Sequence, residues 1–112
     1  MWLSYVELAI SFDSLTGSEV KVHCRLLVDC DDSFLASDYE AFCRRERIPI
    51  IDNGVISQQL LATMPAYGGG ECIYDEDAWI KGVAVYGIDG AMQLLLKSCR
   101  VCRDSYEVTI GA

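Results

Sequence analysis

The stretch Val-Lys-Val-His-Cys-Arg-Leu-Leu-Val at positions 20–28 alternates strictly between apolar and polar side chains over its first seven residues. This period of two is typical of a strand with one buried face, because successive side chains point to opposite sides of a sheet. We therefore predict a strand over residues 20–28, in which Lys21, His23 and Arg25 face solvent. The inward side chains would be Val20, Val22, Cys24, Leu26 and Val28.

The segment before this strand shows a similar alternation over residues 6–12. Residues 13–18 lie between the two segments and are rich in turn-forming types, which predicts an antiparallel hairpin. Matching the two buried faces allows a register in which Glu7 lies opposite Arg25, a favourable cross-strand pair.

Two later segments carry helix signals. Ser37-Asp38-Tyr39-Glu40 is a capping-box pattern, and it predicts a helix that ends before Pro49. Asp89 precedes a leucine-rich run and predicts a second helix that reaches about Cys102. This second helix would be apolar around most of its circumference and would pack centrally.

The remaining segments complete the predicted fold. Asp52-Asn53-Gly54 could turn a hairpin or precede a short helix, and we favour the helix. Strands are predicted over residues 72–74 and 79–86, around an acidic turn at 75–77, and again over residues 106–110. The chain is therefore expected to form a single α+β domain over residues 1–112. It would consist of a mostly antiparallel sheet of about five strands with two or three helices packed on one face.

Composition excludes several classes of function. The formal net charge is -8, from 17 acidic and 9 basic residues. Such a charge repels phosphate backbones and anionic membranes, and it attracts basic proteins. We expect a basic protein partner, no direct nucleic-acid binding and no membrane association, and composition leaves the oligomeric state open.

The start of the chain lacks the basic region of a signal peptide, and no apolar run reaches the length of a membrane span. We therefore expect a cytoplasmic protein whose six cysteines are reduced thiols.

Three motifs invite a chemical interpretation, and each fails on a physical requirement. Cys99-Arg100-Val101-Cys102 has the spacing of half a zinc site, but the sequence offers no second close pair. Residues 29–40 match several oxygen positions of a calcium loop, yet Phe34 stands where the sharp turn needs glycine. Gly68-Gly69-Gly70 is followed by an acid rather than by lysine, which does not suit a phosphate loop. We expect no cofactor and no metal.

Catalysis also has little support, because the single histidine, His23, lies between Lys21 and Arg25 on a predicted solvent face. We therefore expect a protein that is not an enzyme.

Acidic residues gather in two segments, one near residues 29–40 and one near residues 71–77. Aromatic residues near the second segment are of the type that anchors protein interfaces, and Tyr67 is one of them. Whether the two segments form one surface is left open by the sequence. The candidate partner-binding residues are Asp29, Asp31, Asp32, Glu71, Tyr74, Asp75, Glu76, Asp77 and Trp79.

The segment from Tyr86 to Leu96, in which a Gly-x-Asp turn opens a leucine-rich run containing Gln93, resembles a strand-to-helix element of small bacterial immunity proteins from toxin–immunity systems. The resemblance implies a small, acidic, cytoplasmic protein that neutralises a cognate toxin. Our leading hypothesis is therefore a non-enzymatic inhibitor of a basic toxin, such as a nuclease. The alternatives are a phage anti-defence protein that mimics nucleic-acid charge, and a metal- or thiol-dependent module using Cys99 and Cys102.

Overall fold

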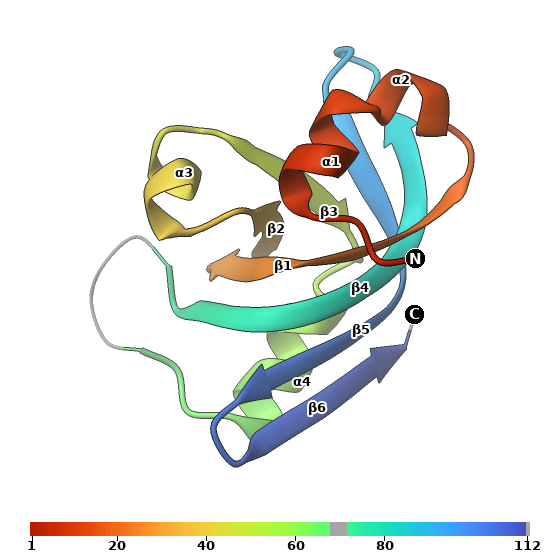
Figure 1. Ribbon diagram of the computed structural model, residues 1–112. Helices are drawn as coiled ribbons and strands as arrows, with labels where there is room; N and C mark the ends of the chain where they lie inside the picture. The colour runs from red at the N-terminus through yellow and green to blue at the C-terminus, as the bar shows by residue number, and fades with distance from the viewer. Residues whose placement is uncertain (68–71, 112) are drawn as a thin grey trace.

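The strand predicted from alternation is the centre of the sheet in the computed structural model, which describes residues 1–67 and 72–111 (Figure 1). It is β1 (Glu19–Asp29), and it pairs antiparallel with β2 (Asp32–Ala36) on one side and β4 (Tyr74–Tyr86) on the other. Its inward residues Val22 and Leu26 are fully buried, as the alternation predicts.

The sheet curls until its strands meet. Among the described residues the strand order is β3-β2-β1-β4-β5-β6, where β3 is Arg47–Ile51, β5 is Met92–Arg103 and β6 is Tyr106–Gly111. A parallel pairing of β3 with β5, at Ile50↔Leu94 and Ile51↔Leu95, closes a small barrel and leaves β6 attached to β5. The α+β class and the mainly antiparallel pairing are confirmed. The finer arrangement differs from the prediction: within the described residues the sheet has six strands rather than about five, includes one parallel pairing and closes into a barrel.

Apolar side chains fill the barrel, and a smaller group lies outside it. Leu26, Ile80 and Leu94 belong to the main cluster inside. The second cluster contains Leu27 and Phe42, and it forms where the short helix α3 (Tyr39–Cys43) covers the outer side of β1 and β2. Within the described residues no helix is long and apolar enough to cross a membrane.

The predicted strand over residues 6–12 is wrong, because this segment forms α1 (Tyr5–Ile10) and α2 (Phe12–Leu15). Ser4 and Glu7 make a reciprocal capping box that starts α1. Leu8 and Phe12 are buried while Val6 is exposed, so the buried side chains repeat every four residues rather than every two. The hairpin and the Glu7–Arg25 pair therefore do not form.

The predicted helix from Asp89 to Cys102 is also wrong, because these residues form a turn followed by β5. Leu94 and Leu96 point into the barrel while Leu95 between them is partly exposed, and the uninterrupted leucine run conceals this alternation. A register shift opposite Lys81 and Gly82 breaks the period further. The segment that resembles an immunity-protein element is thus strand, turn and strand rather than strand and helix.

The middle of the chain is partly as expected. The favoured helix after residues 52–54 is confirmed as α4 (Val55–Thr63), and the last predicted strand is confirmed as β6. The helix at the capping-box pattern is shorter than predicted and is capped by Asp38. β4 runs without a break through residues 75–77, so the expected acidic turn is wrong.

Candidate functional site: the outer sheet face around Trp79

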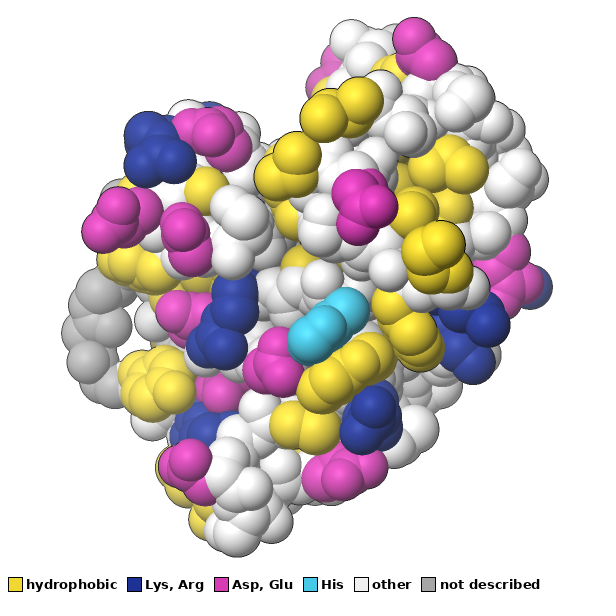
Figure 2. All heavy atoms as spheres, in the orientation of Figure 1, with side chains coloured by type: hydrophobic (Ala, Val, Ile, Leu, Met, Phe, Trp, Pro, Cys, Tyr) yellow, Lys and Arg dark blue, Asp and Glu magenta, His cyan; other side chains and the backbone are white. Residues whose placement is uncertain are grey.

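The strands β1, β4 and β5 present an outer face whose side chains come from positions between the buried ones. Strand pairing aligns His23 of β1, Trp79 of β4 and Arg100 of β5 in one row across this face. Figure 2 shows the face, with the histidine next to hydrophobic side chains and surrounded by charged ones. We treat the outer side of β1, β4 and β5 around Trp79 as the candidate site and call it the Trp79 face.

The indole of Trp79 is held by both neighbouring strands. The ring of His23 stacks on it with centroids 4.2 Å apart and planes 8° apart. The guanidinium carbon of Arg100 lies 4.2 Å from the centroid of the Trp79 ring, which is a cation–π contact. These contacts fix the orientation of a half-buried tryptophan before any partner binds.

A second tryptophan lies beside the first. The backbone of Leu3 is fixed to β1 by two hydrogen bonds, from its N–H to the Lys21 carbonyl (2.8 Å) and from the His23 N–H to its own carbonyl (2.9 Å). Trp2 therefore lies against the sheet, where it lines a hollow of about 220 Å³ together with Trp79. About 39% of its surface remains exposed.

The acidic run of β4 is largely neutralised within the protein. The Arg25 guanidinium donates to the Asp75 carboxylate (2.9 Å) and to the Asp75 carbonyl oxygen (2.7 Å). The His23 ring lies 2.9 Å from the Asp77 carboxylate. Asp75 and Asp77 thus lie on the Trp79 face, but each already has a cationic or hydrogen-bonding neighbour.

Glu76 points to the opposite side of β4 and is only 2% exposed. The Arg103 Nε lies 2.9 Å from each carboxylate oxygen, and an Arg103 terminal nitrogen donates to the same carboxylate. Arg103 also donates to the Pro65 carbonyl (2.7 Å) and stacks on Tyr67. The hydrogen bonds to Glu76 raise the pKa of Arg103, and the pair is structural.

The sequence-predicted aromatic residues separate into two groups. Tyr74 is fully buried, its hydroxyl donates to the Met64 carbonyl (2.6 Å), and burial raises its pKa. Tyr74 and Glu76 are therefore inside the protein and do not reach its surface. Trp79 is half-buried, Tyr67 is 46% exposed, and Glu71 lies outside the described residues.

The other predicted acids lie in and beside the tight turn between β1 and β2. Asp29, Asp31 and Asp32 are exposed, and within the described residues none of them forms an ion pair. The pairing Val28↔Tyr74 places this turn at the end of the barrel where β4 begins. The two acidic segments therefore share one end of the barrel. Within the described residues, Asp75, Glu76 and Asp77 are each paired with a cationic or imidazole side chain, whereas Asp29, Asp31 and Asp32 at the turn are not.

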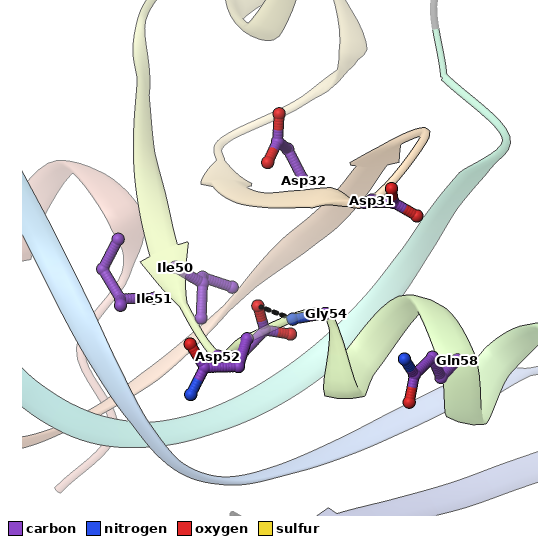
Figure 3. Close-up of a pocket in the computed structure, with 8 residues that line it drawn as sticks. Asp31, Asp32, Ile50, Ile51, Asp52, Gly54 and Gln58 are labelled. Atoms are coloured by element: carbon purple, nitrogen blue, oxygen red, sulfur yellow. Dashed lines mark hydrogen bonds between the residues drawn. The ribbon is translucent and has the colours of Figure 1, made fainter.

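A hollow of about 380 Å³ lies beside the acidic turn (Figure 3). Asp31 and Asp32 line one side, and Asp52 and Gln58 line the other. The Asp52 carboxylate accepts from the Ile56 N–H (2.8 Å) and from the Gly54 N–H (3.3 Å), so it is hydrogen-bonded to the backbone at the start of α4. The hollow is acidic, and one of its three carboxylates is already used by the fold.

The Cys-x-x-Cys motif does not form a chelating pair. Cys99 is buried on the inner side of β5, whereas Cys102 is three residues further along the strand on the outer side. Among the described residues, no group of three or more His, Cys, Asp or Glu side chains has the geometry of a metal site. Burial raises the pKa of the Cys99 and Cys24 thiols to about 12 each.

Thiol labelling should divide the cysteines sharply. Cys30 and Cys43 are exposed and should react with iodoacetamide at pH 8 within minutes, whereas Cys24 and Cys99 should react at least a thousandfold more slowly in the folded protein. Only a very small fraction of a thiol with a pKa near 12 is ionised to thiolate at pH 8. This fraction, and with it the labelling rate, should rise about tenfold with each pH unit. Peptide mass spectrometry would measure the rates, with urea-unfolded protein as the control. Fast labelling of Cys99 in the folded protein would contradict this assignment.

Sequence reasoning missed Trp2, His23 and Arg100 as parts of the site. The alternation did place His23 on the outer side of its strand. The row itself depends on which strands pair, and Arg100 was assigned to a helix. Comparison of the chain with protein-family models, with curated proteins and with solved structures finds no match.

Proposed function

We propose that this protein is a non-enzymatic binding protein that inhibits a basic protein partner, in the manner of an immunity protein that neutralises a toxin. The observation that carries the proposal is the Trp79 face, where two tryptophans lie together at the surface among charged side chains. Tryptophan is enriched among the residues that dominate binding energy in protein interfaces, where a polar rim surrounds an aromatic centre.

The packing of Trp79 favours a protein over a nucleobase as the partner. A base binds tryptophan by stacking on an open ring face, but His23 and Arg100 already stack on this indole. Its outer edge and the neighbouring Trp2 remain available, and they suit an apolar side chain inserted from a partner. The net charge of -8 further disfavours a phosphate backbone.

The acidic turn supplies the charge that would draw a basic partner. Asp29 has the same strand parity as His23 and lies six residues further along β1, which is about 20 Å at the usual rise per residue. A standard interface covers about 800 Å² on each partner, so one partner could contact both the Trp79 face and the turn. Unpaired carboxylates at the rim would mainly raise the association rate.

The proposal can be tested by comparative affinity capture. Wild-type protein, a Trp79→Ala variant and an Asp31→Lys/Asp32→Lys variant would serve as baits in extracts of the source organism, with quantitative mass spectrometry. We expect the wild type to capture a basic protein. The amount of this partner recovered should fall at least tenfold with Trp79→Ala, and the complex should dissociate more readily as the salt concentration is raised. When the captured partner is expressed alone it should arrest growth, and co-expression of the wild-type binding protein should restore growth.

Tyr106→Ala is the matched control, because this residue is an exposed aromatic on β6 that takes no part in the row across Trp79. Thermal unfolding would verify that each bait is folded. The proposal is wrong if no captured protein distinguishes Trp79→Ala from Tyr106→Ala, or if the captured partner has no activity that the wild type suppresses.

A further inference from the structure

A separate hollow of about 640 Å³ lies where the turn between β4 and β5 approaches β2 and β3. In Figure 1 this turn and the connection from α3 to β3 both stand at the upper end of the barrel. The hollow is open to solvent and combines apolar, aromatic and cationic side chains: Phe34, Pro49, Tyr86, Met92, Arg45 and Arg47.

The two arginines of this hollow differ from the others in the chain. Each of the remaining arginines forms an ion pair with a carboxylate, and these are Arg25, Arg44, Arg100 and Arg103. Within the described residues the guanidinium groups of Arg45 and Arg47 take part in no ion pair and no hydrogen bond. Acids outnumber bases by 17 to 9 in this protein, so two neighbouring cations without a carboxylate partner are not explained by a shortage of acids.

Arg47 is held rigidly by aromatic rings. Its guanidinium carbon lies 4.4 Å from the centroid of Phe34 and 4.3 Å from that of Phe42. Its Nη1 atom is buried and has no hydrogen-bond partner. The cation has therefore lost part of its hydration without gaining an acceptor, an unfavourable state that an anion in the hollow would offset.

Arg45 occupies a backbone position that suits glycine. It follows the C-terminal end of α3 with a φ of 68°, in the left-handed region. The N–H of the next residue, Glu46, donates to the Ala41 carbonyl in α3 (2.9 Å), which is the hydrogen bond of a Schellman turn. Glycine would fit here without strain, whereas arginine places a guanidinium beside the hollow.

We propose that this hollow binds a small organic anion. Its carboxylate or phosphate group would lie against Arg45 and Arg47, because the planar arginine fork matches both of these groups. Its apolar body would lie against Phe34, Pro49 and Met92. This site shares no lining residue with the Trp79 face and does not depend on the function proposed there.

The test is a titration of the ¹⁵N-labelled full chain with four probes, followed by amide chemical shifts. Benzoate and phenyl phosphate carry an anion on an apolar ring, inorganic phosphate has no ring, and benzyl alcohol has no charge. We expect saturable shifts around Phe34, Arg45 and Ala91 with the ring anions, with Kd values at least about tenfold lower than for the other two probes. The stronger of benzoate and phenyl phosphate identifies the anionic group.

Three variants make the test decisive. Arg45→Gly should weaken ring-anion binding about tenfold while Tm stays the same or rises by a few degrees, because glycine relieves the left-handed backbone. Arg47→Gln should weaken binding similarly. Arg44→Gln is the control, since Arg44 pairs with Glu46 and does not line the hollow, and it should bind within about twofold of the wild type.

Three results would overturn the proposal. One is the absence of saturable shifts up to about 10 mM ring anion. Another is wild-type affinity in Arg45→Gly, the variant in which loss of folding is least expected. The third is equal binding of inorganic phosphate and phenyl phosphate, which would remove the apolar part of the site.

Discussion

Replacing Arg103 with leucine should lower the free energy of unfolding by about 3–5 kcal/mol. The substitution leaves the Glu76 carboxylate, which is 2% exposed, without its hydrogen-bonded cation. It also removes the bond to the Pro65 carbonyl and the stacking on Tyr67. Urea denaturation monitored by circular dichroism would measure the loss.

The control for this prediction is Arg25→Leu, which breaks the partly exposed pair with Asp75 and should cost about 1 kcal/mol or less. Glu76→Leu combined with Arg103→Leu should recover part of the stability, because no buried charge remains. If Arg103→Leu and Arg25→Leu lower the free energy of unfolding by the same amount, the buried Arg103–Glu76 pair contributes no more to stability than the partly exposed pair.

The second large effect is expected at Gly82, which faces the barrel interior beside the register shift of β4 and β5. A Cβ atom at this position would lie 2.4 Å from the Leu95 carbonyl oxygen and 2.8 Å from the Leu94 Cγ. The nearer atom belongs to the backbone and cannot turn away as a side chain could. Gly82→Ala should therefore cost about 3 kcal/mol, with a fall in Tm of roughly 15 °C.

Gly111→Ala is the matched control for Gly82→Ala, since no atom lies within 4 Å of a Cβ built there. It should change stability by less than about 0.5 kcal/mol. If both alanine variants unfold at the same urea concentration as the wild type, the close approach at Gly82 is not a constraint on the barrel.

The parts of the fold that sequence could predict are those in which local pattern and tertiary environment agree. The first seven residues of β1 alternate because one side of the strand faces the core there, and β6 alternates for the same reason. The strand predicted over residues 6–12 was wrong because the spacing of Leu8 and Phe12 fits both the period of two of a strand and the four-residue spacing of a helix. The Ser4–Glu7 capping box was the local signal that separates the two.

The candidate site shows the same limit. Trp79 and its acidic neighbours could be chosen from residue type alone. The pairing of Asp75 with Arg25, and the alignment of His23 with Trp79, depend on a register between strands that are distant in sequence. Arg45 and Arg47 could be seen only as helix-end cations, because their missing carboxylate partners are a property of the folded surface.

Closure of the barrel has a consequence for how the chain assembles. β1, β2 and β3 are joined in sequence order by antiparallel pairs, and so are β4, β5 and β6, so each half is a meander built from local contacts. The halves are joined by the long β1–β4 pairing and by only two residue pairs between β3 and β5. Local contacts form with little loss of chain entropy, whereas joining the halves must close a long loop. The two meanders are therefore expected to form early and then to pair with each other along β1 and β4. Formation of the short β3–β5 pairing is expected to be the last step of folding.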